Sequence, residues 1–166
     1  MRRVFQAGGA IPPDSPTYVE READGLALLR VRQMEYVHIV VARQMGKICL
    51  LRRLATRLEP EGYLTVRIDL SRLAGMEMDQ WYKALGSAIV GQMAPDTESS
   101  IVDQDSLYKF FIKVAQQRSS LHPIIVTLDE IDSTRLLDFS DGFFSTLRAL
   151  QNAGMFAYES VQQCVD

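Results

Sequence analysis

A glycine and a lysine, Gly46 and Lys47, follow an apolar run and precede a helical pattern, as in a phosphate-binding loop. The run before them, Tyr36 to Ala42, is rich in β-branched residues, whereas apolar residues recur every three or four positions after Gly46. Backbone N–H groups at a helix start bind anions, and a lysine there can reach the β- and γ-phosphates of a nucleotide. The residues predicted to surround the phosphates are Arg43, Gln44, Met45, Gly46, Lys47, Ile48 and Cys49.

Two carboxylates, Asp129 and Glu130, end another apolar and β-branched run. In metal-assisted phosphoryl chemistry, Asp129 would hold Mg²⁺, usually through water, and Glu130 would orient or activate the attacking water. Taken alone, such a pair is commonly a helix cap or a solvated turn, and Gly-Lys after a strand often arises by chance. Their occurrence in this order, about eighty residues apart, favours a nucleotide site.

Strand-like and helix-like segments alternate along the chain, which implies right-handed crossovers and a mainly parallel sheet with helices on both faces. The predicted fold class is therefore α/β, a three-layer arrangement like that of P-loop NTPases. In such sheets ligands bind beyond the carboxyl ends of the strands, where both groups lie. Strands are expected at 36–42, 63–70 and 122–132, and helices within 15–33, 48–58, 78–93, 105–118 and 141–153. The predicted division is an irregular N-terminal arm at 1–17, a core at 18–153 and a divergent tail at 154–166.

The composition is that of one ordinary globular domain: 166 residues, 47% hydrophobic and 23% charged. The net charge of −3 gives no electrostatic reason to expect nucleic acid or an anionic membrane as partner. We interpret the local basic cluster as a solvated helix face plus one anion site. No apolar run approaches the ~18 residues of a membrane span, and the N-terminus lacks the apolar stretch of a secretory signal. A cytoplasmic protein is expected. The basic cluster comprises Arg43, Lys47, Arg52, Arg53 and Arg57.

The blocks "YVEREAD", "ARQMGK", "IDL", "QWY" and "LDEIDS", in this order, resemble the AAA-like ATPase domain of bacterial, especially cyanobacterial, multidomain signalling proteins. That family is similar to the signal-transduction NTPases with numerous domains, within the AAA+ group. The resemblance implies ATP and Mg²⁺ as cofactors, Gly46 and Lys47 as the Walker A residues, and Asp129 and Glu130 as the metal-side and catalytic acids of Walker B. It also implies Arg21 near the adenine, although a surface salt bridge explains Arg21 equally well.

Three departures from the expected pattern affect the predicted activity. Val41 stands where a general phosphate loop has Gly, a position at which the family also often lacks Gly. Ile48 stands where the family has Ser or Thr, which leaves Mg²⁺ one inner-sphere oxygen short and should impair hydrolysis more than binding. The tail "GMFAYESVQQCVD" shows no signal for the further strands and helical lid of the family, so we expect a truncated sheet that lacks its central strand between the first and third.

Two functions follow from these observations. The first is an ATP-binding P-loop module of a signalling-type AAA-like ATPase, with hydrolysis weakened or absent here. The second is a non-catalytic truncated fragment or pseudo-NTPase that acts only as a protein-interaction module. Protein partners or self-association are compatible with both.

Overall fold

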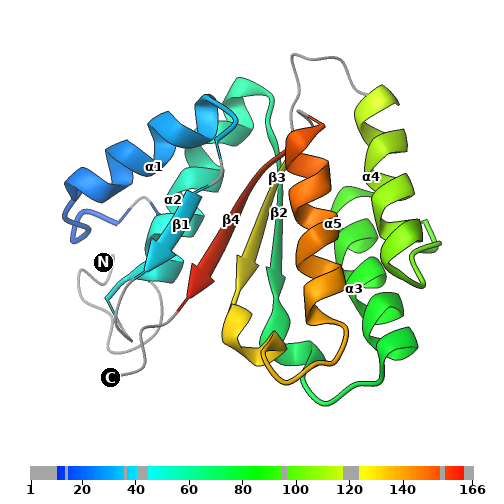
Figure 1. The fold of residues 1–166 in the computed structure, drawn as a ribbon. Helices are drawn as coiled ribbons and strands as arrows, with labels where there is room; N and C mark the ends of the chain where they lie inside the picture. Colours follow the sequence, from blue (N-terminus) through cyan, green and yellow to red (C-terminus); the bar gives the residue numbers. More distant parts are fainter. Residues whose placement is uncertain are drawn as a thin grey trace.

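Four parallel strands form the central sheet of the computed structural model, which describes residues 11–13, 15–35, 37–40, 45–94, 97–117, 124–153 and 156–162. The strands lie in the order β1-β4-β3-β2 (Figure 1). The three strands expected from the sequence are present, because their β-branched, apolar runs suit a sheet covered on both faces. The bounds are Val37–Val40 for β1, Leu64–Asp69 for β2, Ile124–Asp129 for β3 and Phe156–Gln162 for β4.

The expectation that the sheet lacks its central strand is wrong. Strand β4 lies inside the predicted tail and pairs with β1 on one side and β3 on the other. Its sequence, FAYESVQ, mixes polar and apolar residues and carries only a weak pattern of its own. Strand β4 is positioned by backbone hydrogen bonds to strands that are far away in the chain. The local sequence pattern therefore could not predict its place.

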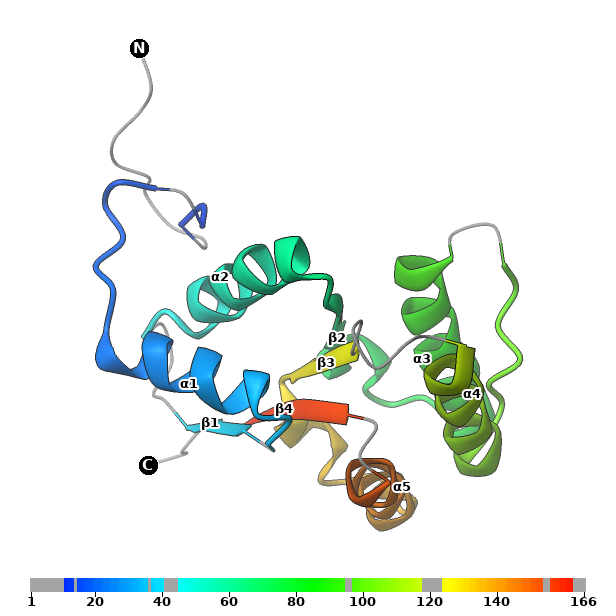
Figure 2. The same ribbon diagram turned by 90° about the horizontal axis from the view of Figure 1, so that it is seen from above.

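Helices cover both faces of the sheet, as predicted. Helices α1 and α2 lie over one face, α5 lies over the other, and α3 and α4 lie beyond β2 (Figure 2). Short 3₁₀ turns η1, η2 and η3 follow α2, β2 and β3. The bounds are Glu22–Arg32 for α1, Lys47–Leu58 for α2, Met78–Met93 for α3, Gln104–Gln117 for α4, Ser140–Asn152 for α5, Glu59–Glu61 for η1, Leu70–Leu73 for η2 and Ile131–Thr134 for η3.

Strand β3 is buried along its whole length and separates two apolar clusters. Ile124, Val126 and Leu128 belong to the larger cluster, with α3, α4 and α5, whereas Ile125 belongs to the smaller cluster, with α1 and α2. Because side chains alternate along a strand, Asp129 lies on the same side as Ile125. The acidic end of β3 is therefore directed toward α2.

The larger cluster is built around Trp81, which is fully buried. Its ring meets those of Tyr82, Phe139 and Phe143 edge to face, at centroid distances of 5.1, 5.4 and 4.9 Å. Such pairs add to the stabilisation from burial alone. This aromatic group joins α3 to α5 and belongs to the core.

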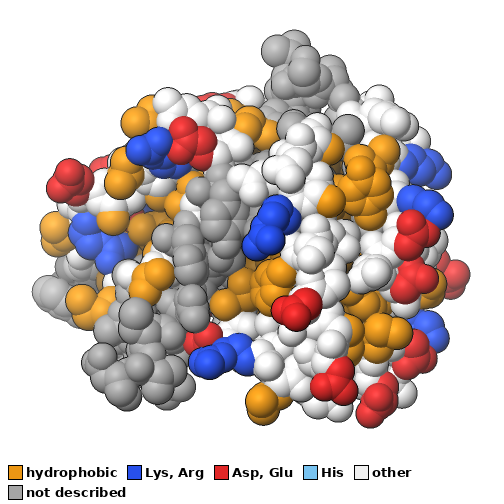
Figure 3. Space-filling model, in the orientation of Figure 1, with side chains coloured by type: hydrophobic (Ala, Val, Ile, Leu, Met, Phe, Trp, Pro, Cys, Tyr) orange, Lys and Arg blue, Asp and Glu red, His pale blue; other side chains and the backbone are white. Residues whose placement is uncertain are grey.

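Charged side chains of both signs are interspersed on the face shown in Figure 3. The basic residues of α2 are partly neutralised, since Arg57 and Arg53 pair with Glu20 at 2.8 and 3.8 Å.

No helix among the described residues has the length and apolar character needed to cross a membrane.

We predict opposite effects for two glycine substitutions in α3. A Cβ at Gly86 would lie 2.3 Å from Ser99 Oγ and 2.6 Å from Ile101 Cβ, whereas a Cβ at Gly91 meets nothing within 4 Å. Gly86→Ala should therefore lower the free energy of unfolding by about 1–3 kcal/mol through overpacking. The control Gly91→Ala should raise it by up to about 1 kcal/mol through helix propensity. Urea unfolding followed by circular dichroism measures both, and equal changes for the two variants would contradict this packing.

Candidate functional site

The start of α2 has the backbone geometry of an anion site. Gly46 lies in the left-handed region, with φ 80° and ψ 19°, and precedes Lys47, the first residue of the helix. Gly46 contributes no side-chain cap, and the first turn contains no acidic residue. The N–H groups of this turn are therefore available to an anion, which the helix dipole also favours. Arg43 and Gln44 lie outside the described residues.

Lys47 reaches the acidic end of β3. Its Nζ lies 2.8 Å from Asp129 Oδ1 and 3.5 Å from Glu130 Oε1, and the lysine side chain is only 10% exposed. The two groups predicted from the sequence thus meet in space, although β4 separates their strands. The lysine thus contacts the Asp129 carboxylate directly.

Asp129 is a buried carboxylate held by two cations. Arg67 on β2 places a guanidinium nitrogen 2.8 Å from Oδ2, opposite Lys47 on Oδ1, and the residue is 3% exposed. The backbone N–H of Glu130 also donates to Oδ1, at 3.0 Å. Burial would raise the pKa of Asp129, but the hydrogen bonds from Lys47 and Arg67 outweigh it and lower that pKa. Asp129 is therefore an anion at neutral pH.

Glu130 occupies a sharp turn immediately after the strand. Its φ of 55° and ψ of 46° place it in the left-handed region, which is uncommon for a residue with a side chain. The turn is closed by Ser133, whose N–H and Oγ donate to the Glu130 carbonyl at 3.0 and 2.8 Å. Ser133 thus acts on the turn itself. The Glu130 side chain, 37% exposed, stays near Lys47.

Arg21 holds the loop before α2 from the side of α1. Its guanidinium donates to the Met45 carbonyl at 2.7 Å, and a Cβ at Gly46 would lie 3.4 Å from the same nitrogen. Arg21 Nε also lies 3.3 Å from Asp24 Oδ2. Arg21 therefore forms an ion pair, as one interpretation of the sequence expected, and also contacts the loop.

Asp24 is the buried anchor of this arrangement, and sequence reasoning missed it. It accepts hydrogen bonds from Tyr18 Oη, from the Arg21 backbone N–H at 2.7 Å and from Arg21 Nε. The signal was its position three residues after the N-cap residue Arg21, where a carboxylate can bond back to the N-cap N–H. Arg53 of α2 stacks over the Tyr18 ring at 4.2 Å, which connects α1 to α2.

The remaining predicted loop residues differ in what they present. Cys49 is buried and its Sγ accepts a hydrogen bond from the Ile11 N–H at 3.3 Å, so its thiol is directed into the protein. Met45 and Ile48 are 60% and 37% exposed at the start of α2. Neither the thiol of Cys49 nor the hydrocarbon of Ile48 supplies an oxygen for a metal. Among the described residues, no group of three His, Cys, Asp or Glu is arranged to hold a metal ion.

Arg67 was also missed by the sequence reasoning. A basic residue in the otherwise apolar and β-branched run "YLTVRIDL" was the available signal. Its register partner on β3 is Thr127, two residues before Asp129. The side chain therefore needs to extend only along the sheet to reach the carboxylate.

A hollow of about 570 Å³ adjoins Lys47 between α1, β1 and the start of α2. Its walls are mainly apolar, and its volume lies in the range of small-molecule sites. Arg21 and Lys47 supply positive charge at its loop end. It is lined by Arg21, Ala23, Leu26, Ala27, Arg30, Glu35, Val37, Ile39, Val40, Lys47 and Leu50.

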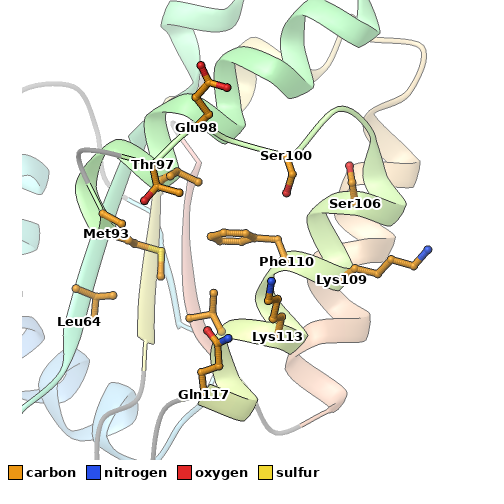
Figure 4. Close-up of a pocket in the computed structure, with 13 residues that line it drawn as sticks. Leu64, Met93, Thr97, Glu98, Ser100, Ser106, Lys109, Phe110, Lys113 and Gln117 are labelled. Carbon is orange, nitrogen blue, oxygen red and sulfur yellow. The ribbon is translucent and has the colours of Figure 1, made fainter.

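A larger hollow, of about 800 Å³, lies between α3, α4 and the loop that joins them (Figure 4). It includes Leu64, the first residue of β2, which pairs with the first residue of β3. It therefore lies at the opposite end of the sheet from Asp129. The Phe110 ring projects into it, and Met93 and Lys113 lie around that ring.

The Asp24 contacts lead to a pH-dependent prediction. Burial would raise the pKa of Asp24, but the hydrogen bonds from Tyr18 and Arg21 lower it below the ordinary 3.8. The stabilisation is thus present above the unfolded pKa and is lost as the pH falls through the lower folded value. Asp24→Asn should lower the free energy of unfolding by about 1–3 kcal/mol near neutral pH. This deficit should shrink at about pH 3, where the unfolded wild-type carboxylate is protonated. Urea titrations at both pH values measure it, and a constant deficit would contradict the assignment.

Comparisons with known proteins identify a family for the chain. A family model described as an AAA-like domain matches residues 6–159. A WD repeat-containing protein of Synechocystis sp. is 31% identical over 161 residues, which cover 89% of this chain and 13% of that protein. The chain thus corresponds to a small part of that relative.

Two solved structures share the fold. Drosophila ORC bound to DNA has a TM-score of 0.58 at 9% identity, covering 87% of this chain and 37% of that one. Aeropyrum pernix ORC1 in complex with DNA has a TM-score of 0.57 at 18% identity, covering 92% and 42%. The P-loop NTPase-like fold predicted from the sequence is confirmed at this level. With the family match over residues 6–159, this chain belongs to the AAA-like domain family.

Proposed function

We propose that this domain binds ATP or ADP at the start of α2, as the nucleotide-binding module of a larger signalling protein. The observation that carries the proposal is the Lys47 ammonium, buried at the first residue of a helix and paired with the carboxylates at the end of β3. A cation held in this way can exchange a carboxylate partner for a phosphate oxygen at small electrostatic cost. The N–H groups of the same helical turn would bind the remaining phosphate oxygens.

The hollow beside Lys47 suits the base and ribose. Its apolar walls on α1 and β1 would contact the base, while Arg21 and Lys47 mark the end nearest the phosphates. Arg21 would act indirectly, because its guanidinium already donates to the Met45 carbonyl and so holds the loop. This assignment places the nucleotide between α1 and the start of α2.

The role as one module of a larger protein rests on the 13% of the Synechocystis relative that the chain covers. The two structural neighbours are complexes with DNA, but DNA is not part of this proposal. The net charge is −3, and Arg53 and Arg57 of α2 are paired with Glu20. We infer ATP or ADP as the ligand, with protein partners in the same assembly.

Nucleotide should stabilise the domain, and Lys47→Ala should abolish that effect. A ligand present at a hundred times its dissociation constant adds about 2.7 kcal/mol to the free energy of unfolding, which a melting curve resolves. Lys113→Ala is the matched control, since Lys113 is an exposed lysine of α4 beside the distant hollow. Its melting curve should shift with ATP or ADP as the wild type does. Unchanged wild-type melting at millimolar nucleotide would refute the proposed function.

Hydrolysis should be negligible in the wild type. Ile48 presents no hydroxyl at the helix start, and the Asp129 carboxylate is already paired with Lys47 and Arg67. Because these residues do not form a hydrolytic site, Glu130 has no attacking water to activate. Glu130→Gln should therefore leave the ATP turnover rate within about twofold of the wild type. Phosphate release measured on both proteins tests this prediction. A rate that falls at least about tenfold on Glu130→Gln would show instead that the domain is an active ATPase.

A further inference from the structure

Arg67 is held in place from both its backbone and its side chain. On the outer edge of β2, the Gln92 side chain of α3 accepts from the Arg67 N–H and donates to the Arg67 carbonyl, both at 2.9 Å. These two bonds replace the ladder bonds that an edge strand lacks. The guanidinium then extends to Asp129 Oδ2 at 2.8 Å and is 34% exposed. Its position is thus defined by α3, β2 and β3 together.

The carboxylate that Arg67 contacts is the acid expected to face Mg²⁺. Both oxygens of Asp129 have a cation at 2.8 Å, Lys47 on Oδ1 and Arg67 on Oδ2. The neighbouring helix position, Ile48, has no oxygen to offer. Magnesium requires a near-octahedral shell of oxygen ligands. Because both Asp129 oxygens face cations and position 48 has no hydroxyl, the residues present do not fit either an inner-sphere or a water-mediated magnesium site at Asp129.

A guanidinium can take the place of the metal as the fixed positive charge. It remains protonated at all accessible pH values and offers several donors in a rigid plane. With Lys47 engaged by phosphate, Arg67 would still neutralise Asp129, so the buried carboxylate would not be left unpaired beside the phosphate anion. Loss of such pairing inside a protein is strongly destabilising. Arg67 thus removes the electrostatic need for a metal at Asp129.

We propose that Arg67 is a positioning residue that occupies the metal-facing side of Asp129, so that this domain binds nucleotide without Mg²⁺. The inference rests on the proposed function and deepens it, since it specifies free nucleotide rather than the magnesium complex as the ligand. A purely structural ion pair between Arg67 and Asp129 would affect stability but would not change the metal dependence of nucleotide binding.

Calorimetric titration of ATP in excess Mg²⁺ and in EDTA tests the proposal. The wild-type dissociation constants should agree within about twofold in the two buffers, whereas Arg67→Gln should bind at least about tenfold more tightly in Mg²⁺ than in EDTA. Arg67→Lys keeps the positive charge and should restore metal independence. The matched control is Arg72→Gln, because the Arg72 side chain is 83% exposed on η2 and its Nε lies as far as 3.7 Å from Asp69 Oδ2. It should behave like the wild type.

The outcomes of these titrations separate the inference from the proposed function. Wild-type ATP binding that requires Mg²⁺ would overturn the inference without harming the proposed function. An unchanged ratio of dissociation constants in a folded Arg67→Gln would also overturn it. Failure of every protein to bind ATP in either buffer would instead refute the proposed function.

Discussion

The buried negative charge of Asp129 is the constraint on which the arrangement of the site depends. A carboxylate that is 3% exposed needs compensating charge, and it receives that charge from two different elements, α2 through Lys47 and β2 through Arg67. Because a buried charge left without its partner is strongly destabilising, the start of α2 is bound to the end of β3. In the proposed function, the same ion pair would also position the lysine for phosphate.

The loop before α2 is held by a second group of polar contacts. Asp24 binds Tyr18 and Arg21, and Arg21 in turn donates to the Met45 carbonyl next to Gly46. Helix α1 and the conformation of this loop are thereby coupled. If a nucleotide occupies the hollow between them, a movement of the loop at the phosphates would be transmitted through Arg21 to α1 and to the segment that precedes α1.

Strand β4 sets the distance between the two halves of the site. Glu159 of β4 pairs in register with Val37 of β1 and with Thr127 of β3. The end of β1 and the acids that end β3 are thus aligned through a strand that contributes no predicted site residue. Without β4, no backbone hydrogen bonds would fix the carboxyl ends of β1 and β3 relative to each other.

The sequence by itself determined the class of the fold and the two halves of the site. Gly46-Lys47 and Asp129-Glu130 were recognisable because apolar, β-branched runs and helical periodicity around them are local properties of the chain. Only the tertiary structure decided three further features: the central place of β4, the burial of Asp24, and the pairing of Arg67 with Asp129. Each depends on contacts between segments far apart in the chain, or on burial that those contacts create. The two cations that pair with the Asp129 carboxylate belong to this group of features, because Lys47 and Arg67 reach it from two other elements.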